Sequence, residues 1–186
     1  MIRHLPATLA LVLAAAPAAA DEFTDTLQSA LEAYEEGDVD GASADLEYAG
    51  KLLTAMKAES LAGFLPAALP GWTRAEADAA ESSGFMGMLG GGTAAAATYT
   101  RGADELTITL VANSPMVSGI GAMITGMGAM TGAKPIRVQR TEFSMNEGEL
   151  QGVVDGKVMI SVGGNASIED KTAYLEAMDF DALADF

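Results

Sequence analysis

The hydrophobic periodicity of this chain changes at one segment, PAALPGW, which spans residues 66–72. Before it, residues 22–60 contain no proline and repeat their apolar positions with the spacing of helices. After it, short alternating runs rich in Val, Ile and Thr are typical of strands. The Pro and Gly residues of the segment mark a linker. The chain therefore has to combine a helical N-terminal part with a sheet, which is an α+β fold.

The helical part divides into two helices that break at Gly37-Asp38, within the segment LQSALEAYEEGDVDGASADLEYAGKLLTA. The turn, the small residues and the packing positions of this segment, about residues 27–55, resemble a single tetratricopeptide-like hairpin. The positions that carry the resemblance are Ala30, Gly37, Asp38, Ala42, Leu46 and Ala49. The segment lacks the proline at the repeat's end and a second copy, and one hairpin cannot form the groove of a repeat array. The family's peptide-binding role therefore does not carry over, and we expect a hairpin packed on the rest of the chain.

The second part predicts an antiparallel β-sheet of about six strands, because short turns such as Asp155-Gly156 join the alternating runs. The expected strands are residues 72–76, 98–101, 106–111, 136–140, 150–154 and 158–162. A Gly/Met-rich helix is expected between the two groups of strands, and a C-terminal helix from the cap Ser167 to about Met178. Asp170 completes a weak capping box. Through its LPGW linker and hairpin the chain loosely resembles small exported α+β proteins of unknown function in Gram-negative bacteria, which implies no activity.

Residues 1–20 have the pattern of a secretory signal peptide. A basic head at Arg3 precedes an apolar run over residues 5–16 and then Ala18-Ala19-Ala20. The run is shorter than the roughly 20 apolar residues that a membrane span needs. We therefore predict cleavage after Ala20, export to the periplasm or beyond, and a single domain over residues 21–186, with the hairpin at 21–62 and the sheet and its helices at 71–186.

Charge and missing residue types exclude several functions. The chain has 26 acidic and 10 basic residues, a net charge of −16, and no cysteine, and its one histidine, His4, lies in the predicted signal. Such a charge repels nucleic acid and anionic lipid headgroups. Without His or Cys there is no His-based triad, thiol nucleophile or zinc-thiolate site. The sequence therefore predicts a non-enzymatic protein without a cofactor.

Two long segments of this acidic chain carry no charge, residues 82–100 and 106–133, and both are rich in Met and Gly. In the second segment a Met-rich stripe follows spacings of 4, 3 and 4 along a helix. Glycines flank the apolar part of the first, which could move as a loop. We expect the two segments to face each other across a small apolar cleft that receives a ligand or partner. The residues of this predicted surface are Phe85, Met86, Met88, Leu89, Met116, Ile120, Met123 and Met127.

Three alternatives for these segments stay open. The helix can be ordinary buried core, with its Met stripe on the sheet. The surface can receive a hydrophobic small molecule or a protein partner, a second copy included, or contact a membrane without spanning it. Met86 and Met88 can instead bind Cu(I), because thioether sulfur is a soft ligand.

Overall fold

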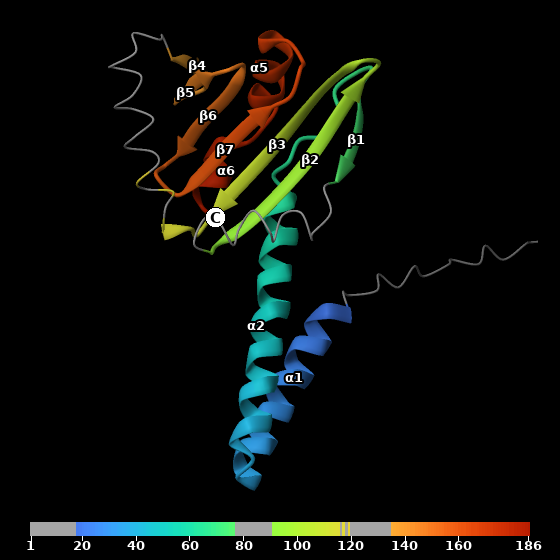
Figure 1. The fold of residues 1–186 in the computed structure, drawn as a ribbon, viewed down its shortest axis with the longest axis vertical. Coiled ribbons are helices and arrows are strands. Elements are labelled where there is room, and N and C mark those ends of the chain that lie inside the picture. Colours follow the sequence, from blue (N-terminus) through green and yellow to red (C-terminus); the bar gives the residue numbers. More distant parts are fainter. Residues whose placement is uncertain (1–17, 77–90, 116, 118, 120–134) are drawn as a thin grey trace, which may run out of the picture. The chain divides into compact units, whose positions relative to one another are not determined.

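The computed structural model describes residues 18–76, 91–115, 117, 119 and 135–186, and it confirms the α+β class (Figure 1). Two helices, α1 (Ala18–Glu36) and α2 (Val39–Ala62), precede an antiparallel sheet, and α5 (Ile168–Glu176) and α6 (Phe180–Ala184) follow it. The chain forms two compact units, one up to Leu53 and one from Thr54 onwards. The second unit thus begins inside α2. The predicted single domain over residues 21–186 stays a prediction.

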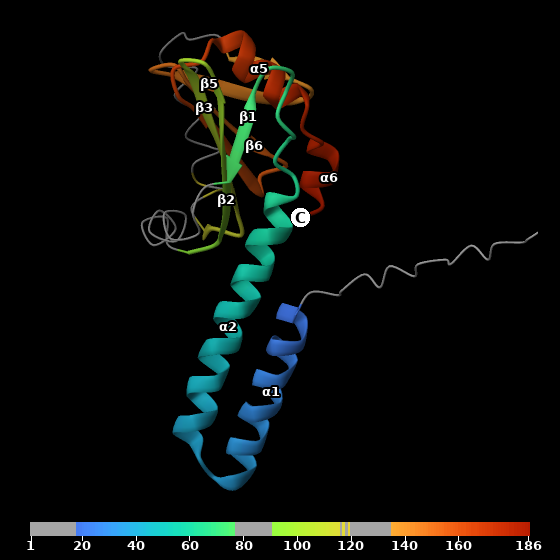
Figure 2. The ribbon, with the colours of Figure 1, turned by 90° about the vertical axis from the view of Figure 1, so that its right-hand side faces the viewer.

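The helical hairpin forms where the sequence places its turn. Gly37 has a positive φ of 86°, a conformation that glycine adopts without strain and that commonly ends a helix. The Asp38 side chain then accepts a hydrogen bond from the Gly41 N–H at 3.0 Å, which satisfies one of the free donors at the start of α2. Figure 2 shows the two helices running antiparallel after this turn.

In the described part of the chain the sheet has seven strands, close to the about six that the sequence predicts. Their order is β1-β2-β3-β7-β6-β5-β4, and every neighbouring pair is antiparallel. The strands are β1 (Thr73–Glu76), β2 (Thr93–Arg101), β3 (Asp104–Ala112), β4 (Ile136–Val138), β5 (Thr141–Asn146), β6 (Glu149–Val154) and β7 (Val158–Gly163). The alternating pattern of residues 136–140 predicted a single strand to residue 140, and β5 was not predicted. Gln139 has a φ of 52°, so the chain turns there and returns as β5.

The two faces of the sheet carry different cores, because successive side chains of a strand point to opposite faces. On one face Tyr99, Ile108 and Ile160 are fully buried in a large cluster that includes side chains of α5 and α6. On the other face Val111 and Met159 form a smaller cluster that includes Val117. The main core therefore lies between the sheet and the C-terminal helices, which cover one of its faces in Figure 2.

The predicted cap of the C-terminal helix is confirmed, and the helix ends two residues earlier than expected. The Ser167 hydroxyl accepts from the Asp170 N–H at 3.1 Å, as an N-cap does. The Asp170 carboxylate accepts from both terminal nitrogens of the Arg101 guanidinium, at 2.9 and 2.8 Å, and from the Ser167 hydroxyl at 2.7 Å. These hydrogen bonds lower the pKa of Asp170. The start of α5 is thereby tied to the end of β2.

Candidate functional site

The Met/Gly-rich surface predicted from the sequence lies outside the described residues. So does the predicted Gly/Met-rich helix, apart from Pro115, Val117 and Gly119. The hypothesis that loop and helix meet across a cleft stays a prediction, and so does the Cu(I) site. The residues concerned are Phe85, Met86, Met88, Leu89, Met116, Ile120, Met123 and Met127.

The described residues contain a different apolar surface, on the hairpin. Seven large apolar side chains of its two helices are between 39% and 66% exposed, and six of them, all except Tyr48, form one set. We call this set the hairpin face; it consists of Leu27, Leu31 and Tyr34 on α1 and Val39, Leu46 and Leu53 on α2. Isolated exposed apolar side chains are normal on a protein surface, but a contiguous patch of them is not. The arrangement of the six is therefore decisive.

Helical geometry puts all six on one side of the hairpin. Ala30 on α1 and Ala49 on α2 are buried along the line where the helices meet. Leu27 and Tyr34 stand three residues before and four after Ala30, and Leu46 and Leu53 stand at the same offsets from Ala49. Two antiparallel helices are interchanged by a twofold axis perpendicular to the plane that contains them. Residues at equal offsets from the contact line therefore lie on the same side of that plane. Val39 is seven residues before Leu46, and Leu31 is four after Leu27, so they extend the two rows.

The opposite side of the hairpin is polar and internally bonded. The Ser29 hydroxyl donates to the Asp45 carboxylate, and the Tyr48 hydroxyl donates to the Glu22 carboxylate, each at 2.7 Å. The bond to Glu22 raises the pKa of Tyr48. Both bonds join α1 to α2. The helices are thus tied on one side by polar side chains, while the hairpin face on the other side has exposed apolar ones.

Acidic residues border the hairpin face. A residue that directly follows a face residue lies about 100° further round the helix. Each charged residue in these positions is acidic, and together they are Glu32, Glu35, Asp40 and Glu47. Residues 21–53 contain ten acidic residues and one basic residue, Lys51, which pairs with Glu47 at 2.8 Å and lowers its pKa. The hairpin face is therefore an apolar strip inside a negative border.

Sequence reasoning overlooked this surface, although the signal was present. The resemblance to a tetratricopeptide hairpin puts Leu46 at a packing position, whereas Leu46 is 57% exposed. Val39, Leu46 and Leu53 recur every seven residues, which is the spacing of a seam that a partner helix covers. The spacing identifies a stripe, but only the structure shows that this stripe is uncovered.

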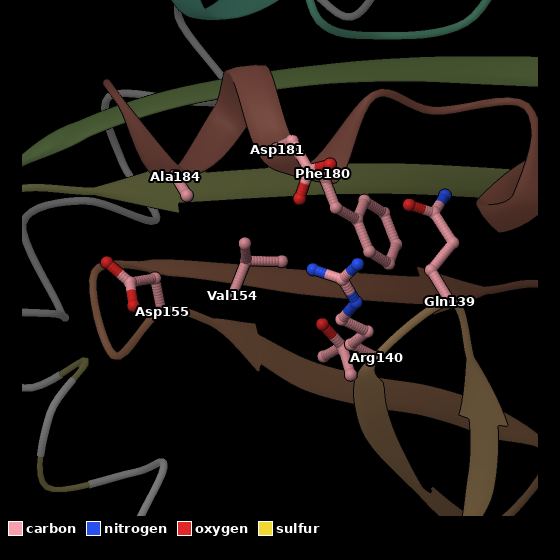
Figure 3. A pocket seen from close by; sticks show the side chains of 8 residues that line it. Gln139, Arg140, Val154, Asp155, Phe180, Asp181 and Ala184 are labelled. Atoms are coloured by element: carbon pink, nitrogen blue, oxygen red, sulfur yellow. The ribbon is translucent and has the colours of Figure 1, made fainter.

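A pocket of about 490 Å³ lies in the second unit, between two strand turns and α6 (Figure 3). Its lining residues are Gln139, Arg140, Thr141, Val154, Asp155, Phe180, Asp181 and Ala184. The Arg140 guanidinium points toward Phe180 in Figure 3, and two carboxylates on the rim oppose an anionic ligand. The Gln139 amide is already engaged, since it donates to the Leu175 and Met178 carbonyls. The pocket therefore offers a ligand little beyond one exposed cation and a phenyl ring.

The buried ammonium group of Lys171, in the second unit, has a structural role. Lys171 is 1% exposed, and its ammonium donates to the carbonyls of Gly148 and Gly164 at 2.6 and 2.7 Å. Burial lowers its pKa. The Lys171 side chain fixes the turn after β5 and the loop after β7. A catalytic role would need these donors to be free for a substrate.

No family model, curated protein or solved structure matches this chain. Within the described ranges, no three His, Cys, Asp or Glu side chains come together in a group that could hold a metal ion. The same part of the chain has no helix that is long and apolar enough to cross a membrane. The surfaces described above are therefore the features of this chain that suggest a function.

Proposed function

We propose that this is a non-enzymatic periplasmic protein that binds a protein partner through the hairpin face. The observation that carries the proposal is the two-sided hairpin, with six exposed apolar side chains on one side and bonded polar pairs on the other. Export follows from the signal pattern of residues 1–20.

The energetics favour a covered hairpin face. Full burial of a large aliphatic or aromatic side chain is worth about 1.5–3 kcal/mol. The six residues of the face are roughly half exposed, so a partner recovers about half of that from each, or roughly 5–9 kcal/mol in total. Association costs are of similar size. The expected complex is therefore reversible.

The shape and charge of the face favour a protein over a small molecule or a lipid bilayer. From Val39 to Leu53 the α2 row is about 21 Å long at 1.5 Å per residue. A small-molecule site encloses most of its ligand in a concavity, whereas these side chains stand on two helix surfaces. An anionic bilayer is repelled by the acidic border.

Site-specific photocrosslinking in the native host tests the proposal. A benzoylphenylalanine at Leu31 or at Leu46 is expected to give an adduct with one protein, which mass spectrometry of the adduct identifies. The control positions are Ser29 and Tyr48, which lie on the opposite side of the hairpin. An adduct with the same protein at the control positions, or adducts confined to residues 54–186 of the same chain, would refute the proposal.

The Met/Gly-rich surface supports a second binding function, suggested by its lack of charge. Met86 and Met88 place two sulfurs close together in sequence. Anaerobic titration with Cu(I) separates metal binding from binding of a hydrophobic ligand. Tight Cu(I) binding that a Met86→Leu, Met88→Leu double variant loses would establish the copper alternative, and binding unchanged in that variant would exclude these two ligands.

A further inference from the structure

We infer that the segment bound by the hairpin face is a basic amphipathic helix of another protein. This inference rests on the proposed function and specifies its partner. The hairpin face supplies two parallel apolar rows, and the residues around it supply negative charge. A helix with one apolar stripe between Lys and Arg residues complements both features at once.

The apolar rows fit a helix in length and spacing. Val39, Leu46 and Leu53 repeat every seven residues, and Leu27, Leu31 and Tyr34 repeat every four and three. Between the rows, the line where the helices meet is occupied by Ala30, Ala42 and Ala49, all buried. Small residues there allow a third helix to approach both rows closely.

The charges decide against a second copy of this chain. Residues 21–53 contain ten acidic residues and one basic residue, so two such hairpins repel each other when they pair. The charged residues that directly follow face residues, Glu32, Glu35, Asp40 and Glu47, are all acidic. With a helix whose apolar stripe is bordered by Lys or Arg, the same acidic residues make attractive contacts. Among apolar partners, the border thus selects a cationic one.

The experiment uses residues 21–186 and three synthetic peptides of about 18 residues, each roughly 27 Å long as a helix. The first peptide has Leu at helical spacing and Lys elsewhere. The second replaces each Lys by Glu. The third has the composition of the first in an order that abolishes the stripe. Fluorescence anisotropy of labelled peptides measures Kd at about 50 and about 300 mM salt, which the screening length separates well.

The Leu/Lys peptide is expected to bind in roughly the micromolar range, because burial of its own leucines and attraction by the acidic border add to the gain from the hairpin face. Affinity should fall about tenfold at the higher salt concentration, since the border charges become screened. The Glu peptide and the scrambled peptide should each bind at least about tenfold more weakly. Equal binding of either one to the wild-type protein would overturn the inference.

Variants locate the binding. Leu31→Gln with Leu46→Gln should weaken the Leu/Lys peptide at least about tenfold, whereas Tyr48→Gln on the opposite side should change Kd less than about twofold. Glu35→Gln with Glu47→Gln should weaken it several-fold, and Glu142→Gln with Glu176→Gln, which removes the same charge from the second unit, should not. Circular dichroism checks that each variant folds. Undiminished binding to the Leu variant would show mere attraction to an acidic protein and overturn the inference.

The outcomes for partner and function are separable. Crosslinked adducts with an identified protein, combined with no binding of the Leu/Lys peptide, would leave the proposed function standing and refute the basic helix. Dimerisation that is seen by analytical ultracentrifugation and lost in the Leu variant would also leave the proposed function standing. It would refute the basic helix, because the partner would then be a second copy of this chain. Absence of both adducts and peptide binding would refute both. Binding to vesicles of anionic lipid that the Leu variant abolishes would make the face a membrane contact and refute both.

Discussion

Tyr99 illustrates how a polar group is accommodated in the main core. Its side chain has no exposed surface, and its ring lies 4.4 Å from that of Tyr174, measured between centroids. Its hydroxyl donates to the Pro66 carbonyl at 2.7 Å. Burial, which disfavours the phenolate, raises the pKa of Tyr99 to about 12. The residue therefore connects the linker segment to the sheet. It also makes the free energy of unfolding change with pH in the alkaline range.

The sign of this dependence follows from the proton balance. The unfolded chain releases the Tyr99 proton near pH 10, the folded protein only near 12. The contribution of Tyr99 to the free energy of unfolding is thus fully present below 10 and is lost as the pH rises through 12. Tyr99→Phe should lower the free energy of unfolding at neutral pH by about 1–2 kcal/mol and reduce the alkaline loss. Urea unfolding across this pH interval measures both effects.

The control for this prediction is Tyr34→Phe, which removes an exposed hydroxyl on the hairpin face. Its free energy of unfolding should match that of the wild-type protein throughout. An alkaline loss in Tyr99→Phe as large as in the wild-type protein would mean that other groups cause it.

At the scale of elements, the pairing of β5 with β6 places a glycine on one strand opposite an aromatic ring on the other. Phe143 pairs with Gly152 in the register of the two strands. A Cβ added at Gly152 would lie 2.8 Å from two ring carbons of Phe143, which is fully buried. Glycine weakens a strand in general, but here the absent side chain provides room for the ring. The register of the strand pair depends on this fit.

Gly152→Ala should therefore lower the free energy of unfolding by about 1–3 kcal/mol, the usual cost of overpacking a core. Gly163→Ala in β7 is a matched control, because nothing lies within 4 Å of a Cβ built there. That control should be neutral or slightly stabilising, since alanine restricts the unfolded chain. Equal destabilisation by both substitutions, measured by urea unfolding, would rule out the steric explanation.

At the scale of the whole molecule, the buried core is distributed unevenly between the two units. Every buried residue of the main cluster, from Leu61 to Leu183, belongs to the second unit. In the described part of the first unit, the buried apolar residues are Ala30, Ala42 and Ala49. Three alanine side chains bury little surface, so the hairpin cannot persist as a separate folded domain.

Deletion of residues 21–53 tests this distribution. The remaining chain should unfold cooperatively, with a Tm within a few degrees of that of residues 21–186, because its core is complete. A peptide of residues 21–53 should show little helix by circular dichroism, since short isolated helices are marginal in water. A shortened chain that fails to fold, or a stably folded peptide, would contradict the prediction.

Several features of the fold could be predicted from local chemistry alone. The turn at Gly37, the cap at Ser167 and the change of periodicity at residues 66–72 each involve a few neighbouring residues, and the structure confirms the helices and strands expected from them. The division between β4 and β5 was missed because a turn at Gln139 requires a positive φ from a residue that rarely adopts one. No local pattern announces that conformation.

Periodicity, capping and composition are thus enough to predict the α+β class, the hairpin, the C-terminal helix and the acidic character. Which apolar residues are covered, in contrast, depends on contacts between residues far apart in the sequence. Ala49 and Leu46 lie on the same helix, three residues apart, yet one is buried and the other is 57% exposed. Burial is a property of the neighbours that the rest of the chain brings to a side chain, and within the hairpin the facing helix covers Ala49 but leaves Leu46 exposed.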